Sequence, residues 1–335
     1  MNISEAQYTA RQFGINGQCS IFKEAAKIQC EQGVKCIKKA NYGIERLMFI
    51  YEVKEYLVKN GFSFVDRFLK TPEGNPYTIY NNEIFVLTDW IDGRECDFDS
   101  ITDVKTAVEI LAKFHHHALG FIASDGTKIR SELGRLPITL RKRSEELLKL
   151  KKIAKKGKDR FDYLYMENVD FFIEKSLNSL KAIDSPVYER LIQKAQKNGE
   201  LCHRDYSYHN LIFSKESRIH IVNFDYCCHE IKVYDIVSFL RKIMSECNWN
   251  VEVAMSVINW YDTINKLDQD EIDIIVGLME YPQKFWRIAN RYYNSRRTRP
   301  ERGFYNKLSD VVSEKEFFID FLDKFKQYSA AGIGR

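Results

Sequence analysis

The sequence predicts an α+β protein of two lobes, a small antiparallel sheet carrying one helix followed by a large, mainly helical part. In the first ninety residues, turn signals are dense and separate short apolar runs of strand type. After residue 93, apolar residues recur at helical spacing almost to the end of the chain. Because 335 residues suffice for two lobes, we expect residues 1–89 to form the first and residues 90–335 the second.

The first lobe is expected to hold about five strands around one helix. Apolar residues at helical spacing predict a helix over Ile44–Val58, which Asn60 and Gly61 end. Near alternation or short apolar runs between turn signals predict the strands, which are Gln18–Phe22, Lys27–Cys30, Val34–Lys39, Phe64–Leu69, Tyr77–Tyr80 and Ile84–Thr88.

The second lobe is expected to consist of helices with few interruptions. The predicted helices are Ser100–Leu119, Ser131–Lys155, Asp162–Ala182, Tyr188–Asn198, Tyr234–Cys247, Val251–Leu267, Glu271–Tyr293 and Ser313–Tyr328. Short apolar runs of strand type interrupt them at Glu200–Cys202, Leu211–Phe213 and Ile219–Phe224.

Composition excludes several classes of protein. The net charge of +4 is too small to indicate nucleic acid as a partner. The N-terminal residues lack the basic and then apolar layout of a secretory signal, and no apolar run approaches the roughly 18 residues of a membrane span. The cysteines form no CxxC pair, which argues against zinc. We therefore expect synthesis in the cytoplasm and no contact with a membrane.

The most informative motif lies between residues 201 and 225. Asp205 is followed five positions later by Asn210, and a short strand then leads to Asn223. In phosphoryl-transfer loops, an aspartate accepts the acceptor's hydroxyl proton, an asparagine reaches a metal ion, and a later carboxylate bridges the metal to the nucleotide phosphates. The spacing predicts a kinase-like fold with Asp205 as catalytic base and Asn210 as metal ligand. Alternatively, Asp205 only caps backbone amides of the loop.

Asn223 stands where the metal-binding carboxylate is expected. Its amide oxygen can ligate Mg²⁺ but lacks the negative charge with which a carboxylate holds that ion. Asp225 would point to the same side if the strand continues, and it is the candidate to replace Asn223 as a metal ligand. The metal-binding motif is therefore degraded, which puts kinase activity in doubt.

Lys38 is the candidate contact for nucleotide phosphates because it lies at the end of a predicted strand. The alternative is an exposed lysine without a ligand. Glu52, on the following helix, is the expected ion-pair partner of Lys38, and Glu45 and Glu55 compete for that role.

The connection between the lobes is expected to contact adenine through backbone groups at Asp89 and Ile91. Trp90 between them either lines that pocket or fills the seam between the lobes. Gly14 and Gly17 precede the first strand, but without a fuller glycine pattern they favour a turn over a phosphate loop.

The chain resembles the aminoglycoside phosphotransferase and choline kinase branch of kinase-like folds, and within it the CotS-type spore coat proteins of endospore-forming bacteria. The residues that carry the resemblance are His203, Asp205-Tyr206 and His209-Asn210-Leu211, the helix Leu111–His115 ending near Gly120-Phe121, and Pro282–Trp286 with Tyr292-Tyr293. Ser207 departs from the pattern, because related kinases carry a lysine or histidine there that can steady the transferred phosphoryl group, and a hydroxyl brings no charge.

The resemblance implies a spore coat protein with weak or absent catalysis, made in the mother-cell cytoplasm, deposited in the coat and in contact with other coat proteins. Asn223 and Ser207 favour this interpretation. The alternative is an active ATP-dependent phosphotransferase that uses ATP and Mg²⁺ on a small hydroxylated acceptor, and Asp205, Asn210 and Lys38 favour it.

Two basic clusters complete the sequence. The first, between Arg141 and Arg160, is interpreted as a solvated helix face. The second could bind an anionic substrate or a coat partner, and its arginines are Arg287, Arg291, Arg296, Arg297, Arg299 and Arg302.

Overall fold

The computed structural model describes residues 1–216, 218–294 and 301–330. Two compact units make up the chain. The first, called the sheet unit, comprises residues 1–131 and 198–229, and the second, the helical unit, comprises residues 132–197 and 230–335. The segment that carries the predicted catalytic loop thus belongs to the same unit as the N-terminal sheet. The division into lobes at residues 89 and 90 stays a prediction.

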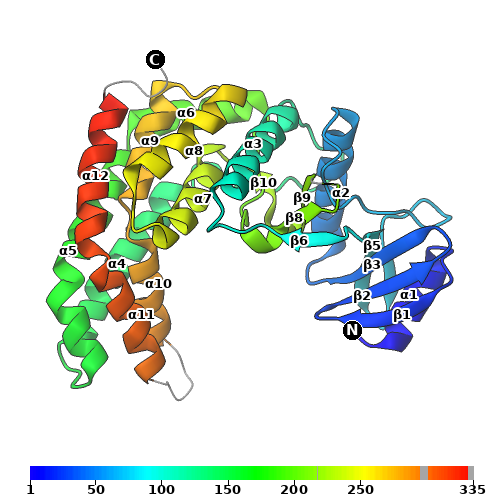
Figure 1. Ribbon diagram of the computed structural model, residues 1–335, viewed down its shortest axis with the longest axis horizontal. Coiled ribbons are helices and arrows are strands. Elements are labelled where there is room, and N and C mark those ends of the chain that lie inside the picture. The colour runs from blue at the N-terminus through cyan, green and yellow to red at the C-terminus, as the bar shows by residue number, and fades with distance from the viewer. Residues whose placement is uncertain (217, 295–300, 331–335) are drawn as a thin grey trace. The chain divides into compact units, whose positions relative to one another are not determined.

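A five-stranded antiparallel sheet forms the first part of the sheet unit, as predicted, with the order β1-β2-β3-β5-β4 (Figure 1). In this sheet Lys38 lies opposite Ala25 on one side and Val86 on the other. The strands are β1 (Gln18–Phe22), β2 (Ala25–Cys30), β3 (Gly33–Ala40), β4 (Thr78–Tyr80) and β5 (Glu83–Asp89).

The sheet carries more than the one predicted helix. The predicted helix is α2 (Ile44–Lys59), but α1 (Ile3–Gln12) also packs on the sheet and was not predicted. The residues that α1 buries are Ala6, Thr9 and Ala10, which are too small to give a clear apolar stripe in the sequence. Its start is marked by a capping box between Asn2 and Glu5.

We expect Asn2→Ala to lower the free energy of unfolding by about 1 kcal/mol, because the Asn2 side chain accepts a hydrogen bond of 2.9 Å from the Glu5 amide. Urea denaturation followed by circular dichroism measures the change. Asn2→Asp, which keeps an acceptor oxygen, is the matched control. Equal stability of Asn2→Ala and the wild type would contradict a role for the cap.

Residues 64–69 do not form the predicted strand. They make isolated bridges instead, from Val65 to Ile221 and from Phe68 to Thr88. The apolar run is buried because this extended segment contacts two different strands in turn, and Asp66 between the two bridges is buried with it.

The rest of the sheet unit consists of α3 (Ile101–Ala118) and short strands around the predicted loop. Two small sheets have the orders β6-β8-β9 and β10-β7. Their strands are β6 (Gly93–Glu95), β7 (Leu201–Cys202), β8 (Leu211–Ser214), β9 (Ile219–Ile221) and β10 (Cys228–His229). The strand predicted over Ile219–Phe224 ends at Ile221, before a single 3₁₀ turn over Phe224–Tyr226.

Helices make up the helical unit, as predicted, with two differences. The helix expected over Glu271–Tyr293 is two helices, because Pro282 interrupts the pattern. A helix over Glu301–Ser313 was not predicted. The helices are α4 (Leu136–Ala154), α5 (Arg160–Ile183), α6 (Pro186–Asn198), α7 (Val233–Glu246), α8 (Val251–Ile264), α9 (Gln269–Met279), α10 (Gln283–Asn294), α11 (Glu301–Ser313) and α12 (Lys315–Ala330).

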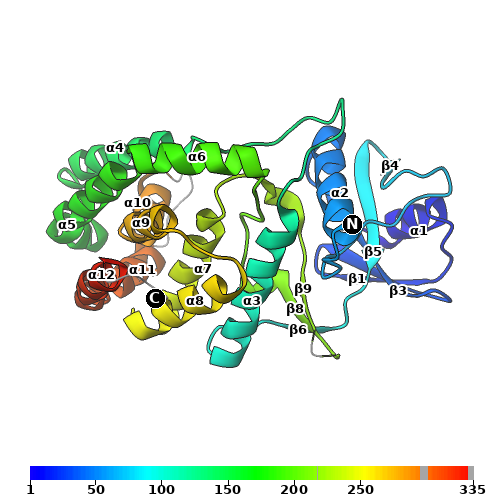
Figure 2. The ribbon, with the colours of Figure 1, turned by 90° about the horizontal axis from the view of Figure 1, so that it is seen from above.

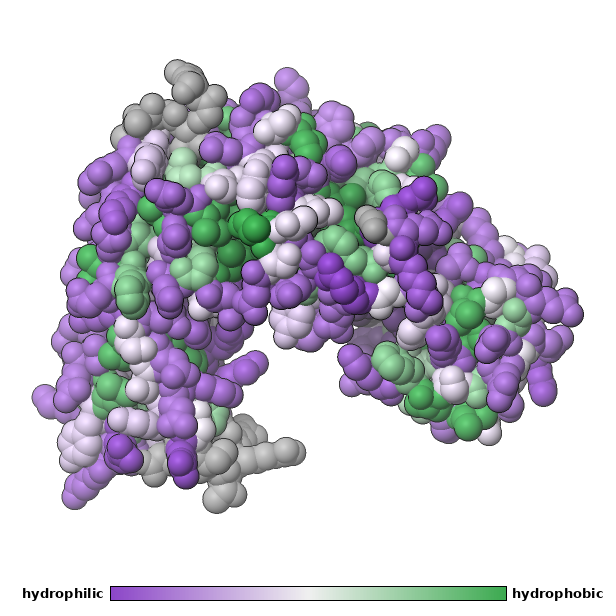
Figure 3. All heavy atoms as spheres, in the orientation of Figure 1, coloured by the Kyte–Doolittle hydropathy of each residue, from purple (hydrophilic) through white to green (hydrophobic). Residues whose placement is uncertain are grey.

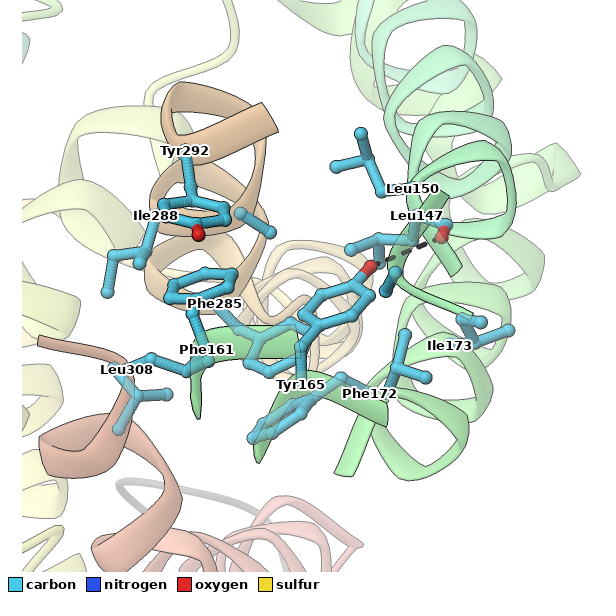
Figure 4. Packing of buried hydrophobic residues seen from close by; sticks show 14 residues of the cluster. Leu147, Leu150, Phe161, Tyr165, Phe172, Ile173, Phe285, Ile288, Tyr292 and Leu308 are labelled. Carbon is cyan, nitrogen blue, oxygen red and sulfur yellow. Dashed lines mark hydrogen bonds between the residues drawn. The ribbon is translucent and has the colours of Figure 1, made fainter. Parts of the chain in front are cut away.

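Aromatic rings fill the core of the helical unit between α5 and α10 (Figure 4). The ring of Phe285 stacks on Phe172 at 4.0 Å and on Tyr165 at 5.2 Å between centroids, and Phe161 stacks on Tyr292 at 3.7 Å. Burial of such rings is a large part of what holds helices together. These tyrosines are therefore packing residues of the core.

Helices α4 and α5 run side by side in the helical unit, in both Figure 1 and Figure 2. Hydrophilic side chains cover much of the visible face of this unit, with smaller hydrophobic areas between them (Figure 3). None of the helices in the described ranges is long and apolar enough to cross a membrane. Of the second basic cluster, Arg296, Arg297 and Arg299 lie outside the described residues.

Candidate functional site

Four of the predicted site residues form one continuous chain of hydrogen bonds, here called the loop network. Lys38 Nζ donates to Asn223 Oδ1 at 2.7 Å, and Asn223 Nδ2 donates to Asn210 Oδ1 at 2.7 Å. Asn210 Nδ2 in turn donates to Asp205 at 2.8 Å, both to carboxylate Oδ2 and to the main-chain oxygen. The sheet unit thus brings together the predicted phosphate contact, the predicted base and two of the three predicted metal ligands, Asn210 and Asn223.

His203 fixes the start of the loop. Its buried ring accepts a hydrogen bond of 3.3 Å from the Asp205 amide at Nδ1, so the proton is on Nε2, which lies 3.0 Å from the Val222 carbonyl oxygen. The ring therefore ties the predicted base to the strand end before Asn223. Ser207 lies in the same loop, and its carbonyl accepts a hydrogen bond from the Asn210 amide.

Asn223 has a left-handed backbone, with φ of 62° and ψ of 60°. Asparagine tolerates this conformation better than most residues. The turn also breaks the alternation on which the interpretation of Asp225 depended, because strand structure has already ended at Ile221. The strand does not continue to Asp225, so the condition under which Asp225 would point to the same side is not met.

Asp225 makes its own contacts. The Tyr42 hydroxyl donates to Asp225 Oδ1 at 3.1 Å. Burial, with Asp225 next to it, raises the pKa of Tyr42 well above its usual range, so this hydroxyl stays a donor. The guanidinium groups of Arg46 and Arg130 both donate to the Asp225 main-chain oxygen. A metal-binding role of Asp225 stays a prediction.

Sequence reasoning missed a buried ion pair between Lys54 and Asp66. Lys54 Nζ lies 2.7 Å from Asp66 Oδ1 and donates to the Asp66 main-chain oxygen at 2.8 Å. The two side chains are only 1% and 5% exposed. Asp66 Oδ2 also accepts from the Asn223 amide at 3.2 Å and lies 3.7 Å from Lys38 Nζ. The ion pair is thus joined to the loop network.

Burial and the neighbouring charges shift the pKa values of both groups. Burial alone would raise the pKa of Asp66, but Lys54, Lys38 and the Asn223 amide outweigh it and hold the pKa below its usual value. Burial lowers the pKa of Lys54, against the opposing effect of Asp66. The Lys54 ammonium also lies over the ring of Phe68, 4.0 Å from its centroid. Asp66 is therefore an ionised carboxylate at neutral pH.

The expected partner of Lys38 lies elsewhere. The Glu52 carboxylate accepts from the Ser124 amide at 2.8 Å and from the Thr127 hydroxyl at 2.5 Å. The competitors are also engaged, Glu45 with Lys128 and Glu55 with Arg67. In the described part of the chain, the carboxylate beside Lys38 is Asp66, which corrects the expected pairing with Glu52. Contact of Glu52 with a nucleotide stays a prediction.

A signal for this pair exists in the sequence. Lys54 takes a position on the buried stripe of α2, between Ile50 and Leu57, where an apolar residue is expected. Asp66 interrupts the apolar run of residues 64–69 in the same way. A lysine and an aspartate that each stand in an apolar pattern are candidates for a buried pair.

The segment predicted to contact adenine continues the sheet. The Trp90 amide donates to the Val34 carbonyl at 2.9 Å, and the Asp89 carboxylate accepts from Lys35 Nζ at 2.5 Å. The Trp90 ring lies against the edge of Phe22, and Lys27 lies over it. Ile91 is half-buried. Backbone contacts of Asp89 and Ile91 with adenine stay predictions.

Gly17 has a structural explanation. A Cβ atom at this position would lie 2.2 Å from the Gln29 carbonyl oxygen, so the close approach of β2 requires glycine. This contact supports the turn rather than the phosphate loop.

Comparison with known proteins identifies relatives that cover most of the chain. The family model described as spore coat putative kinase YutH matches residues 9–325. Spore coat protein S of Bacillus subtilis (strain 168) is 22% identical over 310 residues, which are 90% of this chain and 86% of that protein.

Solved structures show the fold. An aminoglycoside phosphotransferase from Alicyclobacillus acidocaldarius matches with a TM-score of 0.87 and 18% identity, over 97% of this chain and 96% of that one. A spectinomycin phosphotransferase solved with ADP and spectinomycin matches with a TM-score of 0.58 and 14% identity, over 94% and 99% of the two chains. The predicted kinase-like fold of the aminoglycoside phosphotransferase type is therefore confirmed.

Proposed function

Because the chain belongs to the YutH family of spore coat putative kinases, we propose that it is a coat component whose kinase-like fold serves as a scaffold, with phosphoryl transfer weak or absent. One observation carries this proposal. Lys38 Nζ donates to an uncharged amide oxygen of Asn223, at the position where a kinase needs a metal-binding carboxylate.

The donor set of the loop network does not fit Mg²⁺. The amide oxygens of Asn210 and Asn223 already accept hydrogen bonds from Asn223 Nδ2 and Lys38 Nζ. A magnesium ion would have to displace both donors, and the two amides would offer it no negative charge in return. Asp66, the carboxylate beside Lys38, is ion-paired with Lys54. The loop network therefore supports no catalytic step through a metal ion.

An active ATP-dependent phosphotransferase for a small hydroxylated acceptor is the second candidate. The hydrogen bond of 2.8 Å between Asn210 and Asp205 favours it, because it orients the predicted base. A catalytic base alone, without charged protein groups that contact the transferred phosphoryl group, gives only part of the catalysis. Electrostatic stabilisation of the transition state usually contributes most to the rate. ATP held weakly near Lys38, without Mg²⁺, is compatible with the scaffold.

The coat location follows from the family and from the likeness to spore coat protein S. In this proposal the protein is made in the mother-cell cytoplasm and deposited in the coat, where its partners are other coat proteins. A small-molecule acceptor would be needed only by the second candidate.

Fluorescent fusions of the wild type and Asp205→Asn, expressed during sporulation of an endospore-forming host without its own copy, test the proposal. Asparagine keeps the shape of the predicted base and removes its charge. We expect both proteins at the spore surface in equal amounts, with equal resistance of the spores to lysozyme. Asp99→Asn, which changes an exposed carboxylate, is the matched control.

Two results would contradict the scaffold. One is absence of the wild-type fusion from the spore surface. The other is normal deposition of Asp205→Asn in spores that are as sensitive to lysozyme as spores without the protein. Only a reaction that uses the Asp205 carboxylate would then explain the lysozyme resistance of wild-type spores.

A further inference from the structure

The helical unit contains a cluster of polar side chains that the loop network does not use. We call it the arginine cluster, and it consists of Arg143, Arg241 and Tyr281, with Glu146 and Trp286 beside them. Its residues come from α4, α7, α10 and the turn between α9 and α10, since α4 packs on α10 and α7 packs on α9.

Arg241 is a cation for which the described residues supply no carboxylate partner. Its guanidinium donates from Nη2 to the Leu278 carbonyl oxygen, and its buried Nε has no hydrogen-bond partner within the described ranges. Among the same residues, no carboxylate lies within salt-bridge distance of it. Burial, with a smaller effect of the neighbouring Arg143, lowers the pKa of Arg241 to about 10. The Arg241 side chain as a whole is half-buried, and a partly buried charge without a carboxylate partner costs free energy.

Tyr281 adds a second unpaired donor. Its side chain is 2% exposed, and its hydroxyl has no partner in the part of the chain that the structure describes. It stands where Pro282 separates α9 from α10, at the break that the helical pattern did not predict. Burial raises its pKa, while Arg143 and Arg241 act in the opposite direction. The hydroxyl is thus a donor held near two guanidinium groups.

The carboxylate of the cluster, Glu146, is engaged by other groups. Glu146 Oε2 accepts from Trp286 Nε1 at 2.8 Å and from Asn290 Nδ2 at 3.2 Å. Arg143 instead lies over the Trp286 ring, 4.2 Å from its centroid, and donates to Gln283 Oε1 at 2.9 Å. Trp286 therefore contacts both charged groups, the carboxylate through its ring nitrogen and the guanidinium through its face.

We propose that the arginine cluster binds the oxyanion of a small phosphate or carboxylate ligand. The Nε–H of Arg241 and the hydroxyl of Tyr281 would donate to it, and Arg143 would supply a second positive charge. Two unpaired donors and an uncompensated guanidinium match an anion with several acceptor oxygens, and they repel a cation. The site goes beyond the proposed scaffold, because it lies outside the loop network and needs no phosphoryl transfer.

Ligand-induced stabilisation tests the proposal on the whole protein. The midpoint temperature of thermal unfolding is measured at increasing concentrations of sodium phosphate or sodium acetate, up to about 20 mM. Sodium chloride keeps the ionic strength constant. We expect a saturable rise with one or both oxyanions, and calorimetry then gives the dissociation constant. Saturation by phosphate alone would identify a phosphate site, and saturation by acetate alone a carboxylate site.

Variants separate binding from folding. Arg241→Gln is expected to weaken binding at least about tenfold, because it removes the charge that faces the ligand. Tyr281→Phe is expected to weaken binding while leaving the ligand-free protein as stable as the wild type or more so, since it removes an unpaired buried hydroxyl. A purely structural tyrosine would not give these opposite effects. Arg141→Gln, an exposed arginine on the same helix as Arg143, is the matched control.

Two results would overturn the site. One is no saturable rise of the midpoint, with either oxyanion, beyond that in chloride. The other is a rise that Arg241→Gln and Tyr281→Phe leave unchanged, because the anion would then bind elsewhere.

Discussion

Asp66→Ala is expected to lower the free energy of unfolding by about 3–5 kcal/mol, the range found when one partner of a buried ion pair is removed. The substitution leaves the Lys54 ammonium 1% exposed without its carboxylate. Lys38 and the Asn223 amide also lose a contact. The loss therefore affects both the core of the sheet unit and the loop network.

Urea denaturation of the whole protein measures this effect. Glu55→Ala on the same helix as Lys54 is the control, since the ion pair of Glu55 with Arg67 is more exposed and such pairs contribute about 0–1 kcal/mol. The double variant Lys54→Met/Asp66→Leu is expected to recover most of the stability, because it removes both buried charges. A loss below about 1 kcal/mol in Asp66→Ala would contradict a paired, ionised Asp66.

The pH dependence gives a second readout of the same pair. The pKa of Asp66 is lower in the folded protein than in the unfolded chain, so its contribution to stability is present above the unfolded pKa near 3.8 and is lost as the pH falls through the folded value. We expect the wild type to lose stability in acid more steeply than Asp66→Asn below about pH 4. Parallel curves of unfolding free energy against pH for the two proteins would contradict the lowered pKa of Asp66.

Asn223→Asp is expected to create Mg²⁺-dependent ATP binding at least about tenfold tighter than that of the wild type. The change adds a negative charge at the atom that now lies 2.7 Å from Lys38. It also removes the Nδ2 donor that occupies Asn210 Oδ1, so this oxygen becomes available to a metal ion. Aspartate tolerates the left-handed backbone at this position, so we expect no loss of stability from strain.

Calorimetric titration with ATP, with and without Mg²⁺, measures this gain. Asn223→Ala is the control, since it removes the same hydrogen bonds without adding a charge and is expected to gain nothing. The double variant Asn223→Asp/Asp225→Asn asks whether Asp225 contributes a ligand. Equal affinities of Asn223→Asp and Asn223→Ala would show that the missing charge is not what limits binding.

The large features of the fold could be predicted because they depend on repeated patterns. Alternation and turn signals indicated β1 to β5, and helical spacing indicated most of the helical unit. Helix α1 was missed because the side chains it buries are small. The break before α10 was missed because apolar residues continue on both sides of Pro282. Local sequence patterns indicate which residues are buried and whether they follow a helix or strand period. They indicate poorly where the chain changes direction.

The candidate site could be predicted only in part, for the same reason. Asp205, Asn210 and Asn223 were found because a loop motif has fixed spacing, and the structure brings them together with Lys38. The partner of Lys38 was assigned to the wrong residue because spacing on a helix does not show which side chains turn inward. Asp66 comes from a segment without regular structure, and its contact with Lys38 depends on tertiary packing.

In our proposal Asn223 leaves the loop network without a magnesium site, so any binding of ATP by the wild-type protein should not depend on Mg²⁺. The decisive experiment is a calorimetric titration of the wild type with ATP, once in Mg²⁺ and once in EDTA. We predict the same weak affinity in both, because the amide oxygens of Asn210 and Asn223 are held by protein donors. An affinity that rises about tenfold or more in Mg²⁺ would contradict the loss of the magnesium site and favour an active phosphotransferase.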